Sequence, residues 1–539
     1  MAGGTWIDQN KVRPGVYINY KSAPASLATM GERGTVAIAR VMDWGEQGKF
    51  YTIESPSDCV QLGHAITDAE MLFVRQILLG SNRTQGATKI LVWALNQKTT
   101  TTTAKAVINH GGGTLTVTSK LVGDEGNKLS VEFVNGSSGG YIKCLTKYNG
   151  EVVATSSDFS NPGGHPSDNS YVSFLDAGSP IYQLETVNLS GGETGASNAT
   201  ATIGDTVATA KYPGTYGNRL SFDIEHAGED SPYTVNTYLD GVVVDSQTVN
   251  DWNYLHGNDY VTFSGDLTAG GVQTALTGGA NGTPTTTAYS DFLNALELQK
   301  FDIVIYDGTD ATTKTAFADF VKRLSNQEGV KCQAVLSDAT NPDNECIINV
   351  YPQAVTLTDG TELAASELTW WVGGASAGAN VFESLTYAAY PDAIEVDPVL
   401  TSSQQEAAIN AGKFALITQF DRIQVLTDIN SFVTFAVEKG KAFRKNRVIR
   451  TVFGLCNDIY KTFATYYIGA VHNDEEGRKS LKAEILNLLE RYQGNRAVQN
   501  VETDDVIVNK GVDSDAVVIE CYIQPVDSIE KIYINITIS

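Results

Sequence analysis

The pattern of apolar and polar positions changes twice along the chain, and two threonine-rich runs mark the changes. The first run is Thr99–Thr103, and the second, Thr283–Thr287, precedes Tyr289. Between the runs, short stretches of alternating apolar residues are separated by Gly, Ser, Thr and Asn, which is typical of strands joined by turns. Outside them, segments with helical periodicity alternate with apolar strands. The sequence therefore predicts an all-β middle region between two α/β regions.

The middle region contains an internal repeat, which indicates a duplicated structural unit. Three pairs of segments match at offsets of 91, 89 and 87 residues: Gly126–Phe133 with Gly217–Ile224, Tyr171–Phe174 with Tyr260–Phe263, and Leu189–Gly192 with Leu276–Gly279. The Gly-Asn pair that opens the first match suits a backbone position with positive φ before a strand. We predict two tandem β-modules, over 104–196 and 197–283, each large enough for a small sandwich.

The regions outside the repeat show strands and helices in alternation. Apolar residues between Met71 and Leu78 predict one face of a helix that ends before Gly80. The later part of the chain adds, in order, a strand over 301–306, a helix over 317–324 and strands over 330–336 and 346–351. Because strand–helix–strand units join parallel strands, we predict a sheet that is at least partly parallel.

A long amphipathic helix is predicted from Arg444 to about Tyr467. Its apolar residues recur at helical spacing on one face. At about 100° per residue, Arg447, Arg450 and Lys461 point away from that face. The pattern therefore predicts a helix that packs along one side and presents basic residues on the other.

Both ends of the chain have an extended pattern. A second helix begins near Asp474, and strands are predicted over 516–523 and 531–538 with a turn at 524–525. Near the start, Arg13–Asn19 is a turn followed by an extended run. A terminal strand can close its own sheet, or it can add to the sheet edge of a neighbouring molecule.

Length and composition restrict the possible functions. The chain has 539 residues, enough for about three or four domains. Apolar residues make up 42%, which excludes wholesale disorder. The 38 Lys and Arg residues against 62 Asp and Glu give a formal net charge of −24. Such a chain repels phosphate backbones, so nucleic acid is not expected as a partner.

The start of the chain has no basic region followed by an apolar one, and no apolar run approaches the length of a membrane helix of about 18 residues. The cysteines are spaced singly, which favours a reducing compartment over a disulfide framework. We therefore expect a protein made in the cytoplasm that has no membrane as a partner.

One segment matches an enzyme motif. Gly374–Gly378 fits the G-x-S-x-G pattern, in which a strained turn exposes the serine, here Ser376, as a nucleophile. A hydrolase would also need a downstream histidine, and only His472 follows in the sequence. The alternative is a glycine-rich strand-to-helix turn in which small residues allow close packing. We favour the alternative and expect a protein that is not an enzyme.

No motif predicts a cofactor or a metal. Asp310 reads as a helix N-cap rather than part of a phosphate loop. Asp338, Asp343 and Glu345 lack the spacing of a calcium loop, and the histidines form no metal-binding cluster. We expect none of these groups to hold a catalytic or bound ion.

The strongest charge signal is basic. The stretch 439–450 holds six basic residues in a chain that is otherwise acidic. It could be a solvated helix face whose charges pair with nearby carboxylates. It could equally be a positive patch that binds an acidic protein partner.

Four segments resemble contractile phage tail sheath proteins, of the kind found in phages and prophages of Gram-positive bacteria: Pro14–Tyr17, Trp371–Gly378, Lys445–Thr451 and Gln524–Tyr533. The resemblance covers 1–100 and 284–539, and the middle region fits the β-sandwich domains that this family inserts on its outer surface. Two related modules are a departure from the family pattern. The implied fold class is multidomain α/β, with a mixed α/β sheath core and two tandem inserted all-β sandwich-like modules.

The resemblance and the repeat together divide the chain into seven parts. These are an N-terminal extended arm (1–20), an N-terminal α/β part of the core (21–103), two β-modules (104–196 and 197–283), a central α/β domain (284–400), a C-terminal α/β domain (401–530) and a C-terminal strand arm (531–539).

The resemblance implies a structural subunit that polymerises helically around a tail tube and contracts to drive the tube through the host envelope. In the family, terminal strands cross into the sheets of neighbouring subunits. By position, these arms would be carried by Val12, Pro14, Gly15, Val16, Tyr17, Ile532, Tyr533, Ile534 and Ile536. We further expect a basic patch facing the acidic tube, formed by Lys441, Arg444, Lys445, Arg447 and Arg450.

The partners implied are other copies of the chain, the tail tube protein, and baseplate and tail terminator proteins, and the implied location is the virion tail. Two other classes of function stay open. A surface adhesin would use the tandem β-modules but should carry an export or anchoring signal. A serine hydrolase would depend on Ser376.

Overall fold

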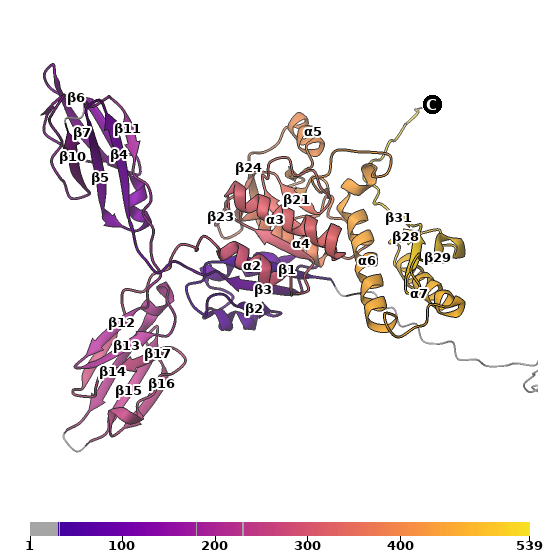
Figure 1. Ribbon diagram of the computed structural model, residues 1–539, viewed down its shortest axis with the longest axis horizontal. Helices are drawn as coiled ribbons and strands as arrows, with labels where there is room; N and C mark the ends of the chain where they lie inside the picture. Colours follow the sequence, from indigo (N-terminus) through magenta and orange to yellow (C-terminus); the bar gives the residue numbers. More distant parts are fainter. Residues whose placement is uncertain (1–30, 32, 179–180, 229–230, 539) are drawn as a thin grey trace, which may run out of the picture.

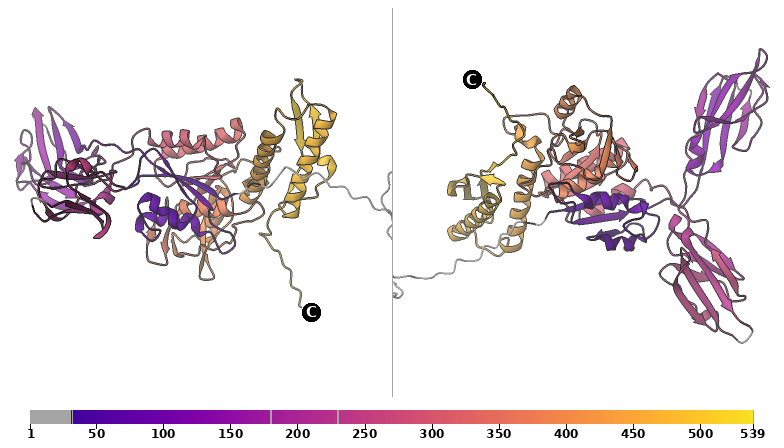
Figure 2. Two further views of the ribbon diagram at one scale, coloured as in Figure 1. Left: turned by 90° about the horizontal axis from the view of Figure 1, so that it is seen from below. Right: turned by 180° about the vertical axis from the view of Figure 1, so that it is seen from behind.

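The computed structural model describes residues 31, 33–178, 181–228 and 231–538. Within them the chain forms a central α/β core, two β-sandwiches that extend from one side of it, and a C-terminal domain on the opposite side (Figure 1). The same separation is visible from below and from behind (Figure 2). The predicted fold class, a mixed α/β core with two tandem all-β insertions, is confirmed.

The centre of the core is a seven-stranded sheet in the order β2-β3-β1-β19-β20-β21-β25. Neighbouring strands are parallel except β2 and β3, as the strand–helix–strand pattern predicts. The strands are β1 Thr35–Arg40, β2 Phe50–Ile53, β3 Lys89–Ala94, β19 Ile303–Tyr306, β20 Gln333–Ser337, β21 Ile347–Val350 and β25 Lys413–Phe414.

Helices cover both faces of this sheet because alternate strand residues point to opposite sides. Ile38 packs with Phe73 of α1 and Trp371 of α4, whereas Ala37 packs with Phe292 and Phe317 on the other face. The helices of the core are α1 Leu72–Leu79, α2 Ala288–Leu296, α3 Ala311–Arg323, α4 Leu368–Gly378 and α5 Ser402–Asn410, with short 3-10 turns at Pro56–Leu62 and Ala69–Met71 and a π-turn at Leu324–Glu328. Asp310 caps α3 by accepting from Thr313 N, as predicted.

Two small sheets complete the core. They comprise β22 Ala354–Leu357, β23 Glu362–Leu363 and β24 Ala393–Asp397 in one, and β26 Leu416–Gln419 with β27 Arg422–Val425 in the other. Phe414, Leu416 and Val425 are buried in the same hydrophobic cluster as the central sheet. The domain boundary predicted at residue 400 therefore falls inside the central domain, because β25 is the last strand of its sheet.

The repeat corresponds to two sandwiches of the same topology. Module 1 contains the sheets β10-β5-β4 and β11-β6-β7-β8, with β9 beside β7, and module 2 contains β17-β13-β12 and β18-β14-β15-β16. The strands of module 1 are β4 Thr103–His110, β5 Gly113–Val122, β6 Leu129–Asn135, β7 Tyr141–Tyr148, β8 Glu151–Thr155, β9 Phe159–Ser160, β10 Val172–Gly178 and β11 Thr186–Asn188. Those of module 2 are β12 Thr200–Ile203, β13 Thr206–Ala210, β14 Leu220–His226, β15 Tyr233–Leu239, β16 Val242–Val249, β17 Val261–Ser264 and β18 Gly271–Ala275. Short 3-10 turns lie at Asp124–Lys128, Thr215–Arg219 and Trp252–Tyr254.

Three connecting segments of the chain pair with one another where the modules leave the core. Isolated β-bridges join Gln97 to Pro284, Thr102 to Glu193, and Ser197 to Ala280. Ala196 N donates to Lys98 O at 2.7 Å, so the two ends of module 1 lie side by side. Module 1 is therefore held through its connecting segments.

Module 2 is held in addition by an aromatic contact with the core. Trp44, in the loop after β1, is 6% exposed and belongs to the hydrophobic cluster of module 2. Its ring lies 5.2, 4.7 and 6.4 Å from the ring centroids of Tyr212, Tyr216 and Tyr260. Aromatic pairs of this kind contribute about 0.5–1.5 kcal/mol each beyond the burial of area.

A buried histidine supports this contact. The ring of His64 lies edge-on to Tyr216 at 5.2 Å. Its Nε2 is 2.8 Å from Asp43 Oδ1 and its Nδ1 is 3.2 Å from Asp68 Oδ2. Burial disfavours the charged imidazole, but the hydrogen bond and charge of Asp43, the hydrogen bond of Asp68 and the charge of Glu70 outweigh it and raise the pKa of His64.

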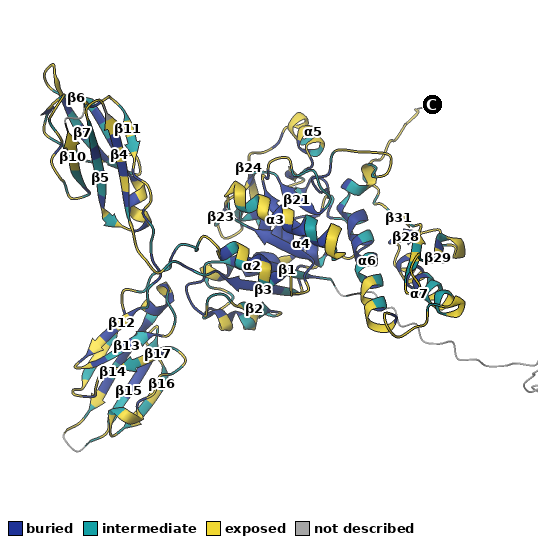
Figure 3. Ribbon diagram, viewed as in Figure 1, coloured by how far each residue is buried: buried dark blue, intermediate teal, exposed yellow. Residues whose placement is uncertain are grey.

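The C-terminal domain contains two long helices and two short sheets. The helices are α6 Asn446–Tyr466 and α7 Glu475–Gly494, and Asp474 caps α7 by accepting from Gly477 N. The strands are β28 Val498–Gln499, β29 Val506–Lys510, β30 Val517–Cys521 and β31 Gln524–Pro525, with 3-10 turns at Lys441–Arg444 and Thr503–Asp505. The burial map shows α6 buried on the side that faces the core (Figure 3). Among the described residues, no helix is long and apolar enough to cross a membrane.

Candidate intersubunit surfaces

Helix α6 connects two hydrophobic cores. Ile449 and Phe453 are buried in the cluster that covers the central sheet. Leu455 is buried with Ile485 and Leu489 of α7. The apolar stripe predicted from the sequence therefore serves both domains, and α6 is the element that joins them.

The prediction that Arg450 points away from the packed face of α6 is wrong. Its guanidinium forms an ion pair with Asp428, and the two side chains are 0% and 1% exposed. Arg450 also donates to Glu383 O at 2.8 Å, and Asp428 accepts from Leu385 N and Asn446 Nδ2, each at 3.0 Å. A buried charge needs such partners to offset its desolvation. This network fixes the start of α6 to the central domain.

The other basic residues of the predicted patch are also largely engaged. Arg444 is buried and donates to Ile409 O at 3.1 Å, and burial lowers its pKa. Arg447 is half-buried and donates to Arg496 O at 3.4 Å, and burial lowers its pKa too. Lys445 forms an ion pair with Glu530. Of these five residues, only Lys441 is exposed, so most of the predicted patch is buried or half-buried in the single chain.

The C-terminal segment leaves the domain after one strand pairing. Val526 N donates to Ala497 O at 2.9 Å, and Glu530 binds Lys445 and accepts from Thr386 Oγ1 at 2.8 Å. From 531 to 538 every residue is exposed and no strand is assigned. The apolar and aromatic side chains of this part are between 74% and 94% exposed: Ile532, Tyr533, Ile534, Ile536 and Ile538.

The N-terminal arm residues Val12, Pro14, Gly15, Val16 and Tyr17 lie outside the described residues. The described chain begins at Gly31, whose N donates to Asp458 Oδ1 at 2.8 Å. Asp458 Oδ2 accepts from the hydroxyl of Tyr492 at 2.7 Å. Burial raises the pKa of Asp458 although these hydrogen bonds favour its charged form.

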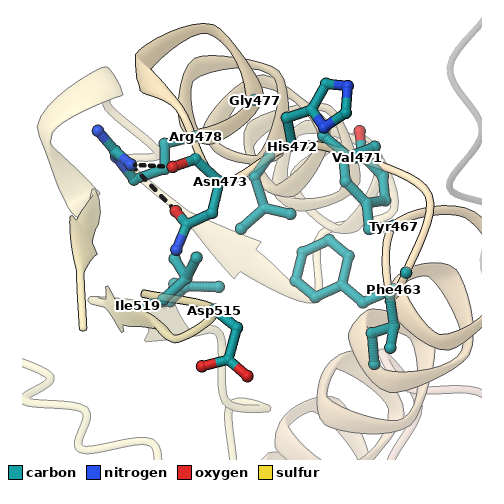
Figure 4. A pocket seen from close by; sticks show the side chains of 13 residues that line it. Phe463, Tyr467, Val471, His472, Asn473, Gly477, Arg478, Asp515 and Ile519 are labelled. Carbon is teal, nitrogen blue, oxygen red and sulfur yellow. Dashed lines mark hydrogen bonds between the residues drawn. The ribbon is translucent and has the colours of Figure 1, made fainter. Parts of the chain in front are cut away.

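An apolar groove lies between the end of α6, the start of α7 and strand β30 (Figure 4). Its volume is about 540 Å³, and its apolar lining includes Phe463, Tyr467, Leu481, Val517 and Ile519. Arg478 and Asn473 are hydrogen-bonded to each other at its rim, at 3.0 Å. β29 and β30 pair only with each other in the described chain, so each has an unpaired edge there.

The G-x-S-x-G segment is not a turn. It lies inside α4, and an added Cβ would come within 2.0 Å of Ile77 O at Gly374 and 2.1 Å of Gly86 O at Gly378. The glycines thus allow α4 to approach α1 and the loop that follows α1. The sequence pattern predicted this close packing, but it placed the glycines in a turn rather than in a helix. Ser376 is 1% exposed and its Oγ has no hydrogen-bond partner in the described chain. A buried helical serine cannot act as an exposed nucleophile.

The acidic residues considered for a cation have separate partners. Asp338 pairs with Lys413 and Glu345 with Lys439, while Asp343 accepts from Val433 N at 2.7 Å. Their carboxylates stabilise loops around the central sheet. Among the described residues, no group of three or more metal-binding side chains is present.

Sequence reasoning missed three carboxylates at these surfaces: Asp428, Asp458 and Glu530. Asp428 lies in a loop 22 residues before Arg450, so helical periodicity cannot relate the two. Asp458 could have been found from the sequence, because it follows Leu455 by three positions and therefore lies on the apolar side of the helix. Such a residue usually has a buried polar partner.

Comparison with known proteins gives one consistent result. Models of the phage tail sheath protein central domain, C-terminal domain and β-sandwich domain match residues 282–431, 438–539 and 193–281. The crystal structure of a sheath tail protein from Desulfitobacterium hafniense is 32% identical, with 96% of this chain and 99% of that chain covered and a TM-score of 0.70. A sheath tail protein from Listeria innocua is 26% identical over 95% and 96% of the two chains, with a TM-score of 0.64. The phage-like element PBSX protein XkdK of Bacillus subtilis (strain 168) is 27% identical over the full length of both chains.

Proposed function

The chain belongs to the phage tail sheath protein family, and on this premise we propose that it polymerises helically around a tail tube by donating its terminal segments to neighbouring copies. The polymer then contracts and drives the tube through the host envelope. The family gives the coarser role, a structural subunit of a phage tail.

The observation that carries this proposal is the C-terminal segment. Ile532, Ile534, Ile536 and Ile538 occupy alternate positions, which in a strand form one apolar face, and each is at least 74% exposed. Burial of four such side chains would contribute roughly 6–12 kcal/mol. A second copy of the chain offers the surface that can bury them.

We place the acceptor of this segment at β30 and the adjacent groove of a neighbouring copy. A two-stranded sheet is marginal alone, and a third strand would satisfy the N–H and C=O groups on its free edge. The groove beside it has an apolar lining that includes Phe463, Leu481 and Ile519, which suits a row of isoleucines. Main-chain hydrogen bonds would supply the affinity. The groove would fix the register of the added strand against β30.

Such a contact joins two different surfaces of the same chain. A heterologous contact of this kind builds an open helix when its rotation does not close into a ring. Exchanged segments would keep neighbouring subunits linked while the subunits rotate during contraction. Contraction is then a transition from a metastable extended lattice to a tighter one.

The remaining partners are the tail tube, baseplate and tail terminator proteins, with synthesis in the host cytoplasm. The tube-facing role predicted for the basic patch now falls on Lys441, with Arg447 as a half-exposed neighbour. Arg444 and Arg450 could reach a tube only after a rearrangement of α6, because both are buried here.

Electron microscopy of the purified full-length chain tests the proposal. We expect hollow, striated cylinders from the wild type, with light scattering reporting their mass. Ile534→Asp/Ile536→Asp should give monomers, because two carboxylates cannot enter an apolar groove.

The matched control is Asn535→Asp/Thr537→Asp, which adds the same charge to the opposite face of the segment. It should assemble like the wild type. Cylinders of normal length from the isoleucine double variant would contradict the proposed arm exchange.

A further inference from the structure

A buried histidine lies where module 2 meets the core. His64 is 2% exposed, and its ring lies edge-on to Tyr216 of module 2 at 5.2 Å. We propose that His64, Asp43 and Asp68 form a proton-operated latch: with His64 protonated they fix module 2 against the core, and loss of the proton releases it. This inference does not depend on arm exchange, because all of its residues lie in one chain.

The contacts of the His64 ring require two N–H groups. Nε2 lies 2.8 Å from Asp43 Oδ1, and Nδ1 lies 3.2 Å from Asp68 Oδ2. An ionised carboxylate can only accept a hydrogen bond, and a neutral imidazole has one N–H and one lone pair. The charged imidazolium therefore satisfies both contacts, whereas a neutral ring would direct a lone pair at one of the two carboxylates.

Asp43 connects the latch to module 2. Its side chain binds His64, while its backbone oxygen lies so close to module 2 that a Cβ added to Gly214 would be 2.1 Å from it. The next residue, Trp44, is buried in the hydrophobic cluster of module 2. A Cβ added to Gly63, the residue before His64, would lie 2.8 Å from Trp44 Cδ1. The position of His64 thus fixes the loop that carries Trp44.

Asp68 is the carboxylate that deprotonation would release. Its side chain is 30% exposed, whereas that of Asp43 is 10% exposed, so the remaining proton should stay on the shorter and more buried contact. The lone pair on Nδ1 then repels Asp68 toward solvent. Asp68 also accepts from Ala65 N at 3.1 Å, so the loop between these residues would move with it. Such a movement takes the His64 ring away from Tyr216.

Three carboxylates of the core face the ring, which determines the direction of the pH dependence. The third, after Asp43 and Asp68, is Glu70, whose Oε2 lies 3.8 Å from Nδ1. Burial alone would lower the pKa of His64, but the hydrogen bond and charge of Asp43, the hydrogen bond of Asp68 and the charge of Glu70 raise it. The latch is therefore closed below the unfolded pKa, about 6.5, and opens as pH rises through the folded value.

The other ionisable groups of the core beside the latch do not reverse this direction. Arg75 donates to two backbone oxygens, at 2.6 and 2.8 Å. Burial raises the pKa of the Cys59 thiol, which keeps it neutral in the range where His64 titrates. Asp58 accepts from backbone N–H groups near the start of the 3-10 turn that holds Cys59.

Module 2 brings one cation to this junction, and that cation has its own partner. Arg219 lies over the ring of Tyr216, 4.8 Å from its centroid, and forms an ion pair with Asp240. Burial raises the pKa of Tyr216 to about 12, so its hydroxyl stays neutral up to pH 9. Protonation of His64 is therefore the change of charge that we expect to act on this contact.

Small-angle scattering of the full chain at pH 6 and pH 9 tests the latch, with size-exclusion chromatography selecting the unassembled chain. We expect the wild type to show a wider range of module 2 orientations at pH 9. Hydrogen exchange of residues 64–68, corrected for the intrinsic effect of pH, should become roughly ten- to a hundredfold faster, because a hydrogen bond between charged groups is lost.

Asp68→Asn is the decisive variant. An asparagine amide can donate to the Nδ1 lone pair of a neutral imidazole, so this contact survives deprotonation. Module 2 should then be held at both pH values, and the corrected exchange should stay the same. The matched control is Glu46→Gln, which removes one negative charge at an exposed position in the loop that carries Trp44. It should keep the pH dependence of the wild type.

A wild type with the same scattering and the same corrected exchange at pH 6 and pH 9 would overturn the latch. Equal pH dependence in the wild type and in Asp68→Asn would overturn it as well. Neither result bears on arm exchange, which fails instead if the Ile534→Asp/Ile536→Asp chain polymerises normally.

Discussion

The two β-modules have the same strand order but different attachments to the molecule. Module 1 has a hydrophobic cluster drawn entirely from its own residues, in the part of the chain that the structure describes. The cluster of module 2 includes Trp44 of the core. One sandwich is therefore tethered through its connecting segments, whereas the other is fixed against the core as a rigid extension.

A comparison of equivalent positions in the two modules shows that a few side chains account for this difference. At the offset of 91 residues, Tyr216 and Tyr212 of module 2 correspond to Glu125 and Leu121 of module 1. Two of the three tyrosines that contact Trp44 are thus a glutamate and a leucine in the other copy, whereas the third, Tyr260, corresponds to Tyr171. A duplicated domain can acquire a fixed orientation through such substitutions without any change of topology.

The largest effect is expected from Trp44→Ala. Loss of a buried tryptophan costs about 3–5 kcal/mol, and here the loss falls on the contact between module 2 and the core. Small-angle scattering should report a wider range of module 2 orientations, and calorimetry a separate, earlier transition. The control Trp252→Ala removes a tryptophan that packs on module 2 alone, and it should lower stability without releasing the orientation.

His64→Gln should have the next largest effect, roughly 1.5–3 kcal/mol at pH 6, because it replaces a hydrogen bond between charged groups. Since the pKa of His64 is raised in the folded chain, its contribution is complete below its unfolded pKa, about 6.5, and is lost as pH rises through the folded value. Unfolding of the core in urea between pH 5.5 and 9 measures this, because Asp43 and Asp68 belong to the core. Equal pH dependence in the wild type and the variant would contradict the role of His64.

Tyr212→Leu introduces the residue that module 1 has at the equivalent position. The Tyr212 ring packs edge-on against Trp44 at 5.2 Å and 89°, and its loss should cost about 0.5–1.5 kcal/mol. Hydrogen exchange in module 2 should increase, while exchange in module 1 stays the same. An increase of equal size in both modules would contradict a contact between Trp44 and Tyr212 that acts on module 2 alone.

Removal of module 1 should have the smallest effect. Ala196 N lies 2.7 Å from Lys98 O, so a short Gly-Ser linker can replace residues 99–195 without moving the core. The free energy of unfolding of the remaining domains should change by no more than about 0.5 kcal/mol. Removal of module 2 by the same approach would expose Trp44 and should cause aggregation. Aggregation of the module 1 deletion as well would contradict the difference in attachment between the two modules.

The features that the sequence predicted well depend on local repetition. The tandem repeat, the parallel sheet and the helix boundaries at Asp310 and Asp474 follow from spacing and capping, which act within a few residues. Trp44 gave no such signal, because its partners lie more than 160 residues away in the sequence. Periodicity indicates which residues are buried, but it does not identify what covers them.

Two errors have the same origin. Glycine disfavours a helix by about 1 kcal/mol, so Gly373, Gly374 and Gly378 predict a turn, but packing against α1 overrides this preference. Arg450 is charged, so the pattern places it outside, but the distant Asp428 makes its burial possible. In both cases the sequence pattern lacks the distant partner, and that partner decides whether the residue is buried.

The exchange of the C-terminal segment is the central claim of this account. A helical reconstruction of cylinders formed by the full-length chain, at a resolution that traces strands, tests it most directly. The account predicts that residues 531–538 of each copy lie as a strand beside β30 of a neighbouring copy, with Ile534 and Ile536 in the groove. Residues 531–538 packed on their own subunit, or exposed to solvent in the polymer, would contradict it.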